Sequence, residues 1–143
     1  MDEHASAVRL FKDGSGAAAV EFAIVAPVFL LLFMGMLAYG IYFGAMHSLQ
    51  QLAADAARAS IAGLNEAERE SIVRQFLDEH ANGYVFVDRE KLELDVGDNP
   101  TGTQFVVSLR YDASHLPIWG LIEGLPLPGK VLSRTSTIRV GGI

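Results

Sequence analysis

The chain has 143 residues, half of them hydrophobic, and it carries 11 Lys and Arg against 17 Asp and Glu, a formal net charge of −6 at pH 7. This length allows one modest domain, and an acidic chain offers no electrostatic footprint for nucleic acid, so no nucleic-acid partner is expected. The sequence contains no cysteine, which excludes disulfides, thiolate zinc sites and cysteine nucleophiles.

Residues 1–16 form a polar leader, MDEHASAVRLFKDGSG. A secretory signal peptide would place its apolar residues before the cleavage site, whereas here the apolar run begins after Gly16. Any cut would therefore fall before the hydrophobic segment, which would stay in the product. Arg9 and Lys12 lie close to that segment, and the first basic residue beyond it is Arg58. The positive-inside rule thus favours a cytoplasmic N-terminus and an outer C-terminal domain.

Residues 17–46 are predicted to span a membrane, because no charge occurs between Phe22 and Met46. At about 1.5 Å of rise per residue, a helix of this length crosses the roughly 30 Å hydrocarbon core. Glu21 stands at the start of the apolar run and allows two interpretations. It either marks the water interface, near the helix N-terminus, or meets a positive group in an assembly, such as an α-amine created by cleavage.

Three residues inside this segment are expected to influence how the helix packs. Pro27 removes a backbone hydrogen bond, which predicts either a passive kink or a local loosening that lets subunits slide. Gly40 and Gly44 form a GxxxG pair, which allows two helix backbones to approach closely in an apolar setting. Tyr39 and Tyr42 suit the aromatic belt at the outer interface.

The helical pattern continues past Met46 through an alanine-rich extension, residues 47–62, without Pro or Gly before Gly63. Alanine favours the helix, so one continuous helix over residues 17–62 is predicted. Asp55 and Arg58 lie on one face of it. Its apolar stripe consists of Leu49, Leu52, Ala53, Ala56 and Ser60.

Residues 63–143 are predicted to form an α+β outer domain. Asn65 suits a helix N-cap with Glu68 completing a capping box, and Asn82-Gly83 suits the end of that amphipathic helix. Alternating apolar residues over 92–96 and 105–111 predict a hairpin, with its turn at 98–102. Residues 84–87 are short and β-rich, and 131–140 form a last strand beside the hairpin. The expected fold is α+β: a long transmembrane helix leads into a domain whose second helix packs on a three- to four-stranded antiparallel sheet.

Residues 113–129 hold three of the five prolines and the sole tryptophan, which predicts an apolar loop. Trp119 and Leu121 in this loop either cap the core of the sheet or offer a surface to a partner.

Catalytic chemistry is not expected. The histidines stand far apart, none of them in a HExxH-like spacing, and neither a phosphate-binding glycine loop nor a G-x-S-x-G motif occurs in the sequence. We therefore predict that the protein is not an enzyme and needs no metal or cofactor.

The stretch GSGAAAVEFAIVAPVFLLLF, residues 14–33, resembles the pilin-like proteins of Tad (Flp-type) pilus systems, in particular TadE-like minor pilins or pseudopilins. In that family a prepilin peptidase cuts after a glycine, and a glutamate followed by an aromatic residue stands fifth in the mature chain. The resemblance implies cleavage between Gly16 and Ala17, with Glu21 and Phe22 in the glutamate and aromatic roles of subunit assembly. It covers residues 14–62 well and the outer domain in outline.

The resemblance implies a minor, pilin-like subunit, because the major pilins of this family are tiny and lack an outer domain. Such a subunit would support assembly, priming or tip function of a pilus in adhesion. Its partners would be membrane lipid, the prepilin peptidase, the major Flp pilin, a second minor pilin and the assembly platform. It would cross the bacterial inner membrane once, with the C-terminal domain in the periplasm, and the extracellular pilus would be a second location.

A rival interpretation is an uncleaved single-pass membrane protein whose outer domain is a scaffold or binds a ligand in the cell envelope. It predicts an intact leader and a Glu21 that tolerates substitution.

Overall fold

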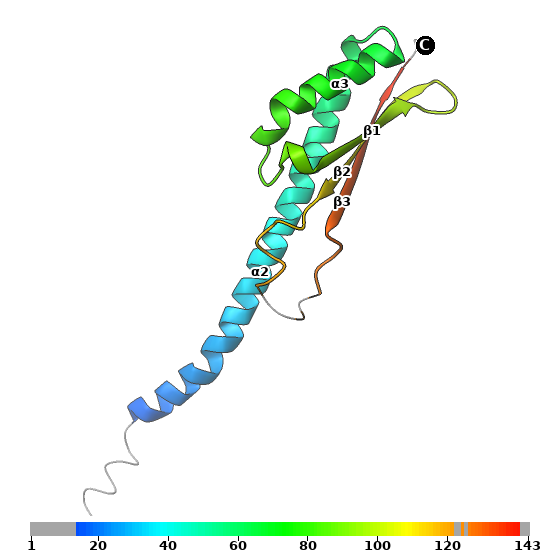
Figure 1. The fold of residues 1–143 in the computed structure, drawn as a ribbon. Coiled ribbons are helices and arrows are strands. Elements are labelled where there is room, and N and C mark those ends of the chain that lie inside the picture. Colours follow the sequence, from blue (N-terminus) through cyan, green and yellow to red (C-terminus); the bar gives the residue numbers. More distant parts are fainter. Residues whose placement is uncertain (1–13, 122–123, 125, 141–143) are drawn as a thin grey trace, which may run out of the picture. The chain divides into compact units, whose positions relative to one another are not determined.

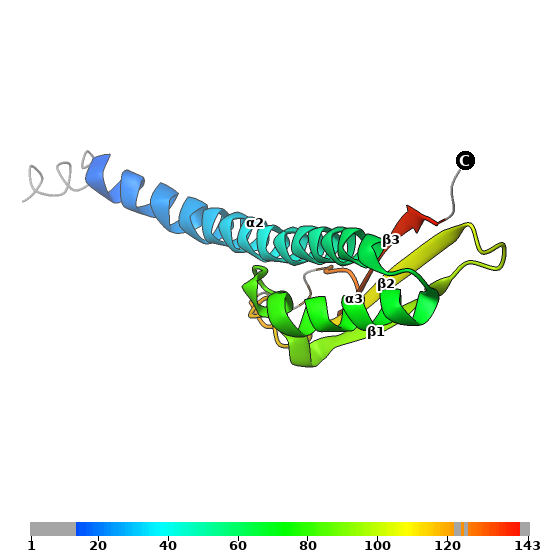
Figure 2. The same cartoon turned by 90° about the horizontal axis from the view of Figure 1, so that it is seen from above.

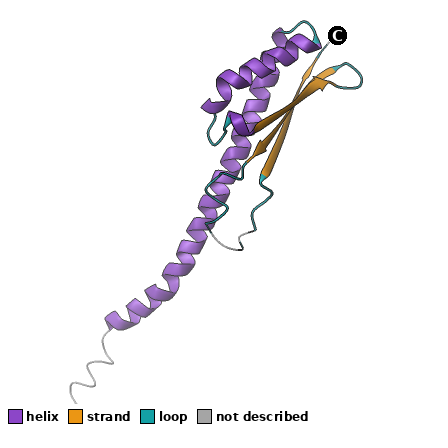
Figure 3. Ribbon diagram, in the orientation of Figure 1, coloured by secondary structure: helices purple, strands orange, loops and turns teal. Residues whose placement is uncertain are grey.

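The computed structural model describes residues 14–121, 124 and 126–140, and the leader prediction falls largely outside them. The chain divides into two compact units, Met1–Leu37 and Ala38–Ile143. The first long helix, α2, covers Gly14–Ala59, and a 3₁₀ turn follows over Ser60–Ala62. The predicted continuous helix is therefore confirmed, and its assignment runs through Pro27 without a break. Figure 3 shows the helices in purple and the strands in orange.

The second unit adds one helix and three strands to the end of α2 (Figure 1). Helix α3 covers Glu66–His80, and the strands are β1 (Leu92–Asp98), β2 (Gln104–Asp112) and β3 (Val131–Arg139). The sheet has the order β1-β2-β3 with both pairs antiparallel. The predicted hairpin and the last strand beside it are confirmed, and so is the α+β fold class.

One face of the sheet and both helices share a single core. Strand alternation decides which face is buried: Phe105, Val107, Leu109 and Tyr111 are fully buried, whereas residues between them are at least partly exposed. From α2 the core receives Leu49, Leu52, Ala53 and Ala56, all fully buried, which confirms the predicted stripe. Figure 2, seen from above, shows α3 and the second half of α2 running along the sheet.

Helix α3 begins as its sequence predicts. The Asn65 side chain accepts a hydrogen bond from the Glu68 amide at 2.9 Å, which satisfies one of the free N–H groups of the first turn. The Glu68 carboxylate accepts in return from the amide of Leu64, at 2.8 Å, one residue before the cap. The helix is also tied to the sheet, because Arg69 pairs with Asp98 at the end of β1.

The β-rich stretch 84–87 is not a strand. It lies between two 3₁₀ turns, Ala81–Gly83 and Arg89–Lys91, and Phe86 has a φ of 65°, which no strand allows. Its aromatic side chains attach the stretch to α2: the Tyr84 hydroxyl donates a hydrogen bond to Asp55, and the Phe86 ring packs on Gly44. Among the described residues the sheet therefore has three strands, the lower of the two expected numbers.

Candidate functional site

The residues predicted for processing and assembly lie in the first turns of α2. The Gly16–Ala17 bond lies inside the helix, and a Cβ added at Gly16 would meet nothing within 4 Å. Glu21 is exposed, one turn after Ala17, and Phe22 beside it is 72% exposed. Among the described residues Glu21 forms no ion pair. The carboxylate is thus available to a partner, although the roles of these four residues stay predictions.

The surface of α2 that follows, up to Leu37, is apolar and bare, meaning that no other described part of the chain covers it. Its large apolar side chains are exposed, from 44% for Leu37 to 75% for Met36, and only Met34 is half-buried. Water would strongly disfavour so much uncovered apolar surface on one helix. By length and composition, α2 meets the requirement for crossing a membrane. Exposed residues of this run include Val20, Ile24, Val25, Val28, Phe29, Leu30, Leu31, Leu32 and Phe33.

Burial begins abruptly at Ala38. Ala38 and Ala45 are fully buried and Tyr42 is 5% exposed, all within the core of the second unit. Tyr42 therefore does not stand in an aromatic belt, contrary to the expectation from its place in the apolar run. The sequence contains a signal for this burial, because positions 38, 42 and 45 extend the stripe of the alanine-rich segment backwards at helical spacing.

The two glycines of the GxxxG pair have different surroundings. A Cβ added at Gly40 would meet nothing within 4 Å, whereas one at Gly44 would lie 3.1 Å from the Phe86 ring. Gly44 thus lets the Phe86 ring of the same chain approach the helix closely. The helix surface at Gly40 has no such neighbour among the described residues and is the part of the GxxxG pair that another helix could contact. Packing between helices through these glycines stays a prediction.

Phe86 is held in its left-handed conformation by a hydrogen-bond centre at Tyr111. The Tyr111 hydroxyl donates to the Phe86 carbonyl at 2.7 Å and accepts from the Asp88 amide at 3.1 Å. The Nε2 atom of His115 lies 3.1 Å from the same oxygen. Burial raises the pKa of Tyr111, so the hydroxyl stays protonated and keeps its donor at neutral pH.

Tyr84 forms the second attachment of this loop to α2. Its hydroxyl donates to the Asp55 carboxylate at 2.7 Å, and Asp55 also pairs with Arg58 on the same helix. Burial, followed by the hydrogen bond and charge of Asp55, raises the pKa of Tyr84 to about 12. The attachment is therefore intact throughout the physiological range.

Trp119 and Leu121 are both partly buried against the core. The Trp119 indole donates to the Ala113 carbonyl at 2.7 Å, and the Lys130 ammonium lies 5.6 Å from the centre of its ring. The same loop is attached to α2, because the Tyr39 hydroxyl donates to the Pro126 carbonyl. Both residues therefore cap the core of the sheet, which is the first of the two interpretations. Part of each side chain remains exposed, and a role of this exposed surface in binding a partner stays a prediction.

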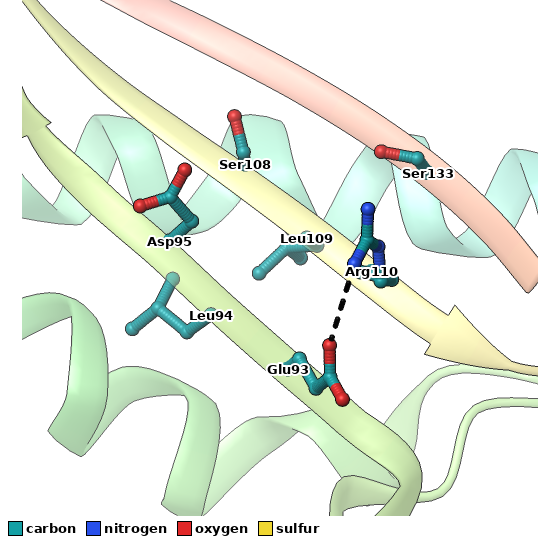
Figure 4. Close-up of a pocket in the computed structure, with 7 residues that line it drawn as sticks. All are labelled: Glu93, Leu94, Asp95, Ser108, Leu109, Arg110 and Ser133. Atoms are coloured by element: carbon teal, nitrogen blue, oxygen red, sulfur yellow. Dashed lines mark ion pairs between the residues drawn. The ribbon is translucent and has the colours of Figure 1, made fainter.

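The face of the sheet away from the helices carries an open polar groove of about 440 Å³ (Figure 4). Its clearest interaction is the ion pair between Glu93 and Arg110, at 4.0 Å, with both side chains more than 65% exposed. Such exposed pairs contribute little to stability or binding. Within the described residues, no cluster of His, Asp and Glu could hold a metal ion. The groove has neither the enclosure nor the convergent polar groups of a ligand site.

Residues 16–58 match the family model described as TadE-like protein. No curated protein matches the sequence, and no solved structure matches the chain. The TadE-like family is associated with the Tad pilus and is not an enzyme family, and residues 16–58 of this chain are therefore similar to a segment of pilus-associated proteins. Together with the apolar helix the match indicates a membrane-anchored protein. The resemblance to TadE-like pilus proteins is thereby confirmed over the segment that contains Gly16, Glu21 and the bare apolar surface.

Proposed function

We propose that the protein is a minor pilin or pseudopilin of a Tad-type pilus, cut by a prepilin peptidase after Gly16. The observation that carries the proposal is the TadE-like match over residues 16–58, which begins at the proposed cleavage site. The bare apolar surface of α2 supports it, because a retained membrane helix is what a pilin-like subunit needs before assembly.

The membrane-spanning part is best placed at residues 17–37, shorter than the 17–46 expected from the absence of charge. A helix over 17–37 rises by about 31 Å, which matches the roughly 30 Å hydrocarbon core. Beyond it, Ala38, Tyr42 and Ala45 face the core of the second unit, so that side of the helix is unavailable to lipid. The helix crosses the inner membrane once, with its N-terminus in the cytoplasm, as Arg9 and Lys12 favour, and the second unit in the periplasm.

Cleavage gives Glu21 a partner. It creates an α-amine at Ala17, one helical turn from the carboxylate, at the positive end of the helix dipole where a cation is unfavourable. A charged side chain at the bilayer centre costs roughly 2.5–3.5 kcal/mol, and less near the edge. Pairing the amine of one subunit with Glu21 of its neighbour relieves both charges and sets the position of the incoming subunit. Phe22 extends the same contact with apolar surface.

The folded second unit makes the protein a minor subunit, one that primes assembly or occupies the tip. Its partners in this role are the peptidase, the major Flp pilin, a second minor pilin and the assembly platform. The pilus serves adhesion and surface attachment.

Three Glu21 variants test the assembly role in cells that carry the pilus system. Glu21→Ala and Glu21→Gln remove the charge, and Glu21→Asp is the matched control that keeps it. We expect the first two to be made and inserted in the membrane at normal levels, with a loss of piliation that Glu21→Asp restores at least in part. Normal piliation in Glu21→Ala cells would remove the pairing role and favour a plain membrane scaffold.

A further inference from the structure

We propose that the described residues of the loop between β2 and β3, which are 113–121, 124 and 126–130, rest on the phospholipid headgroups, with Trp119 as an aromatic anchor and Lys130 in reach of lipid phosphate. The occupant of this surface is thus the membrane itself, not a protein partner. The inference rests on the membrane anchoring of α2 that is part of the proposed function. The inference gives the protein a second contact with the membrane, made by the second unit in addition to α2.

The attachment of the loop to α2 fixes the level of Pro126. The Tyr39 hydroxyl donates to the Pro126 carbonyl, and Tyr39 follows Leu37, the last residue of the bare apolar run, by two positions. Two residues correspond to about 3 Å along a helix. Pro126 is therefore held where the lipid-exposed surface of α2 ends, the depth of the headgroup region.

The composition of the loop suits that depth. The sequence between Ala113 and Lys130 carries two formal charges, Glu123 and Lys130. The remaining side chains are largely apolar, and they keep part of their surface exposed: Pro117, Trp119, Leu121, Pro126, Leu127 and Pro128. Irregular backbone is excluded from the hydrocarbon core but tolerated at the interface, where water and headgroups satisfy its polar groups.

Trp119 and Lys130 form the chemical signature of an interfacial anchor. Tryptophan is enriched at membrane interfaces because its ring is apolar and its N–H is polar. Here the N–H is satisfied by the Ala113 carbonyl, at 2.7 Å, so the exposed part of the ring is apolar. Lys130 is exposed, with its ammonium 5.6 Å from the ring centre. A long basic side chain in that place directs its charge towards phosphate while its stem covers apolar surface.

Trp119 is the only tryptophan, so its fluorescence reports on this loop in the unmodified protein. The full chain is reconstituted into phosphatidylcholine vesicles whose acyl chains carry bromine, a quencher, either near the carbonyl end or near the methyl end. Two reporters in a Trp119→Phe background serve as controls. Phe29→Trp lies within the proposed span, and Pro100→Trp lies at the hairpin turn, separated from the loop by strand β2, about 27 Å at roughly 3.4 Å per residue.

We expect Trp119 to be quenched clearly by bromine near the carbonyl end and weakly by bromine near the methyl end, and Pro100→Trp by neither. Phe29→Trp should be quenched by both. If Phe29→Trp is quenched and Trp119 is not, the loop does not touch lipid and the inference is wrong, while membrane anchoring stands. If Phe29→Trp is not quenched either, anchoring itself is wrong. Stronger quenching of Trp119 near the methyl end would also contradict a headgroup position.

Discussion

Arg69 on α3 donates from one guanidinium nitrogen, Nη2, to both carboxylate oxygens of Asp98 at the end of β1, at 3.2 Å each. The arginine side chain is 8% exposed and its guanidinium lies over the Phe105 ring, 5.2 Å from the ring centre. This pair joins the second helix to the sheet. Removing Asp98 would leave the buried charge of Arg69 without compensation.

We therefore expect Asp98→Ala to destabilise the second unit by about 3 kcal/mol. The double variant Arg69→Met/Asp98→Ala removes the buried charge as well and keeps the apolar stem, so it should recover part of that loss. Unfolding of the detergent-solubilised full chain by denaturant, followed by circular dichroism, measures both. A double variant that is less stable than Asp98→Ala would contradict this account of the pair.

Gly63 is required by the close approach of α3 to the end of the first helix. A Cβ at Gly63 would lie 2.7 Å from the backbone nitrogen of Arg69, and backbone cannot move aside as a side chain end can. Gly63→Ala should therefore cost about 1–3 kcal/mol through overpacking. Gly83→Ala is the matched control, since a Cβ there would meet nothing within 4 Å. If the two variants unfolded at the same temperature, α3 would not approach Gly63 as closely as described.

Tyr84 predicts a dependence of stability on alkaline pH. Its pKa is raised from 10.0 to about 12 in the folded protein, so folding favours the protonated hydroxyl. The stabilisation is fully present below pH 10 and is lost as the pH rises towards 12, because the unfolded chain ionises first.

The free energy of unfolding of the wild-type chain should thus fall more steeply over this range than that of Tyr84→Phe, which has no phenol to ionise. Denaturant unfolding at a series of alkaline pH values gives the comparison, and the ultraviolet absorbance of tyrosinate checks the ionisation directly. Parallel stability curves for the two proteins would mean that burial and Asp55 do not raise the pKa of Tyr84 in the folded protein.

The regular elements were predictable from the sequence because each has a local signal. The absence of charge and the alanine-rich stripe indicate α2, the cap at Asn65 indicates the start of α3, and alternation indicates the hairpin of β1 and β2. The route of residues 84–87 was not predictable, since aromatic and β-branched residues favour a strand locally. Only the contacts of Tyr84 with Asp55 and of Phe86 with Gly44, distant in sequence, decide otherwise.

The site was predictable to a different degree. Gly16 and Glu21 stand out by their order along the chain, and the TadE-like match covers both. The end of the bare apolar surface was not predictable from charge, because an apolar residue in lipid and one in a protein core have the same composition. Ala38 and Tyr42 belong to the core, and what distinguishes them from Leu37 in the sequence is their place on the stripe of the alanine-rich segment, not their composition. The Arg69–Asp98 pair, 29 residues apart, has no local signal either.

Processing between Gly16 and Ala17 is the central claim, and the N-terminus of the protein extracted from membranes tests it most directly. In cells with an active prepilin peptidase, N-terminal sequencing and intact mass should show a chain that begins at Ala17, shortened by the whole leader. The uncleaved form should accumulate when the peptidase is inactivated. A chain that keeps its full leader while the peptidase is active would contradict the account.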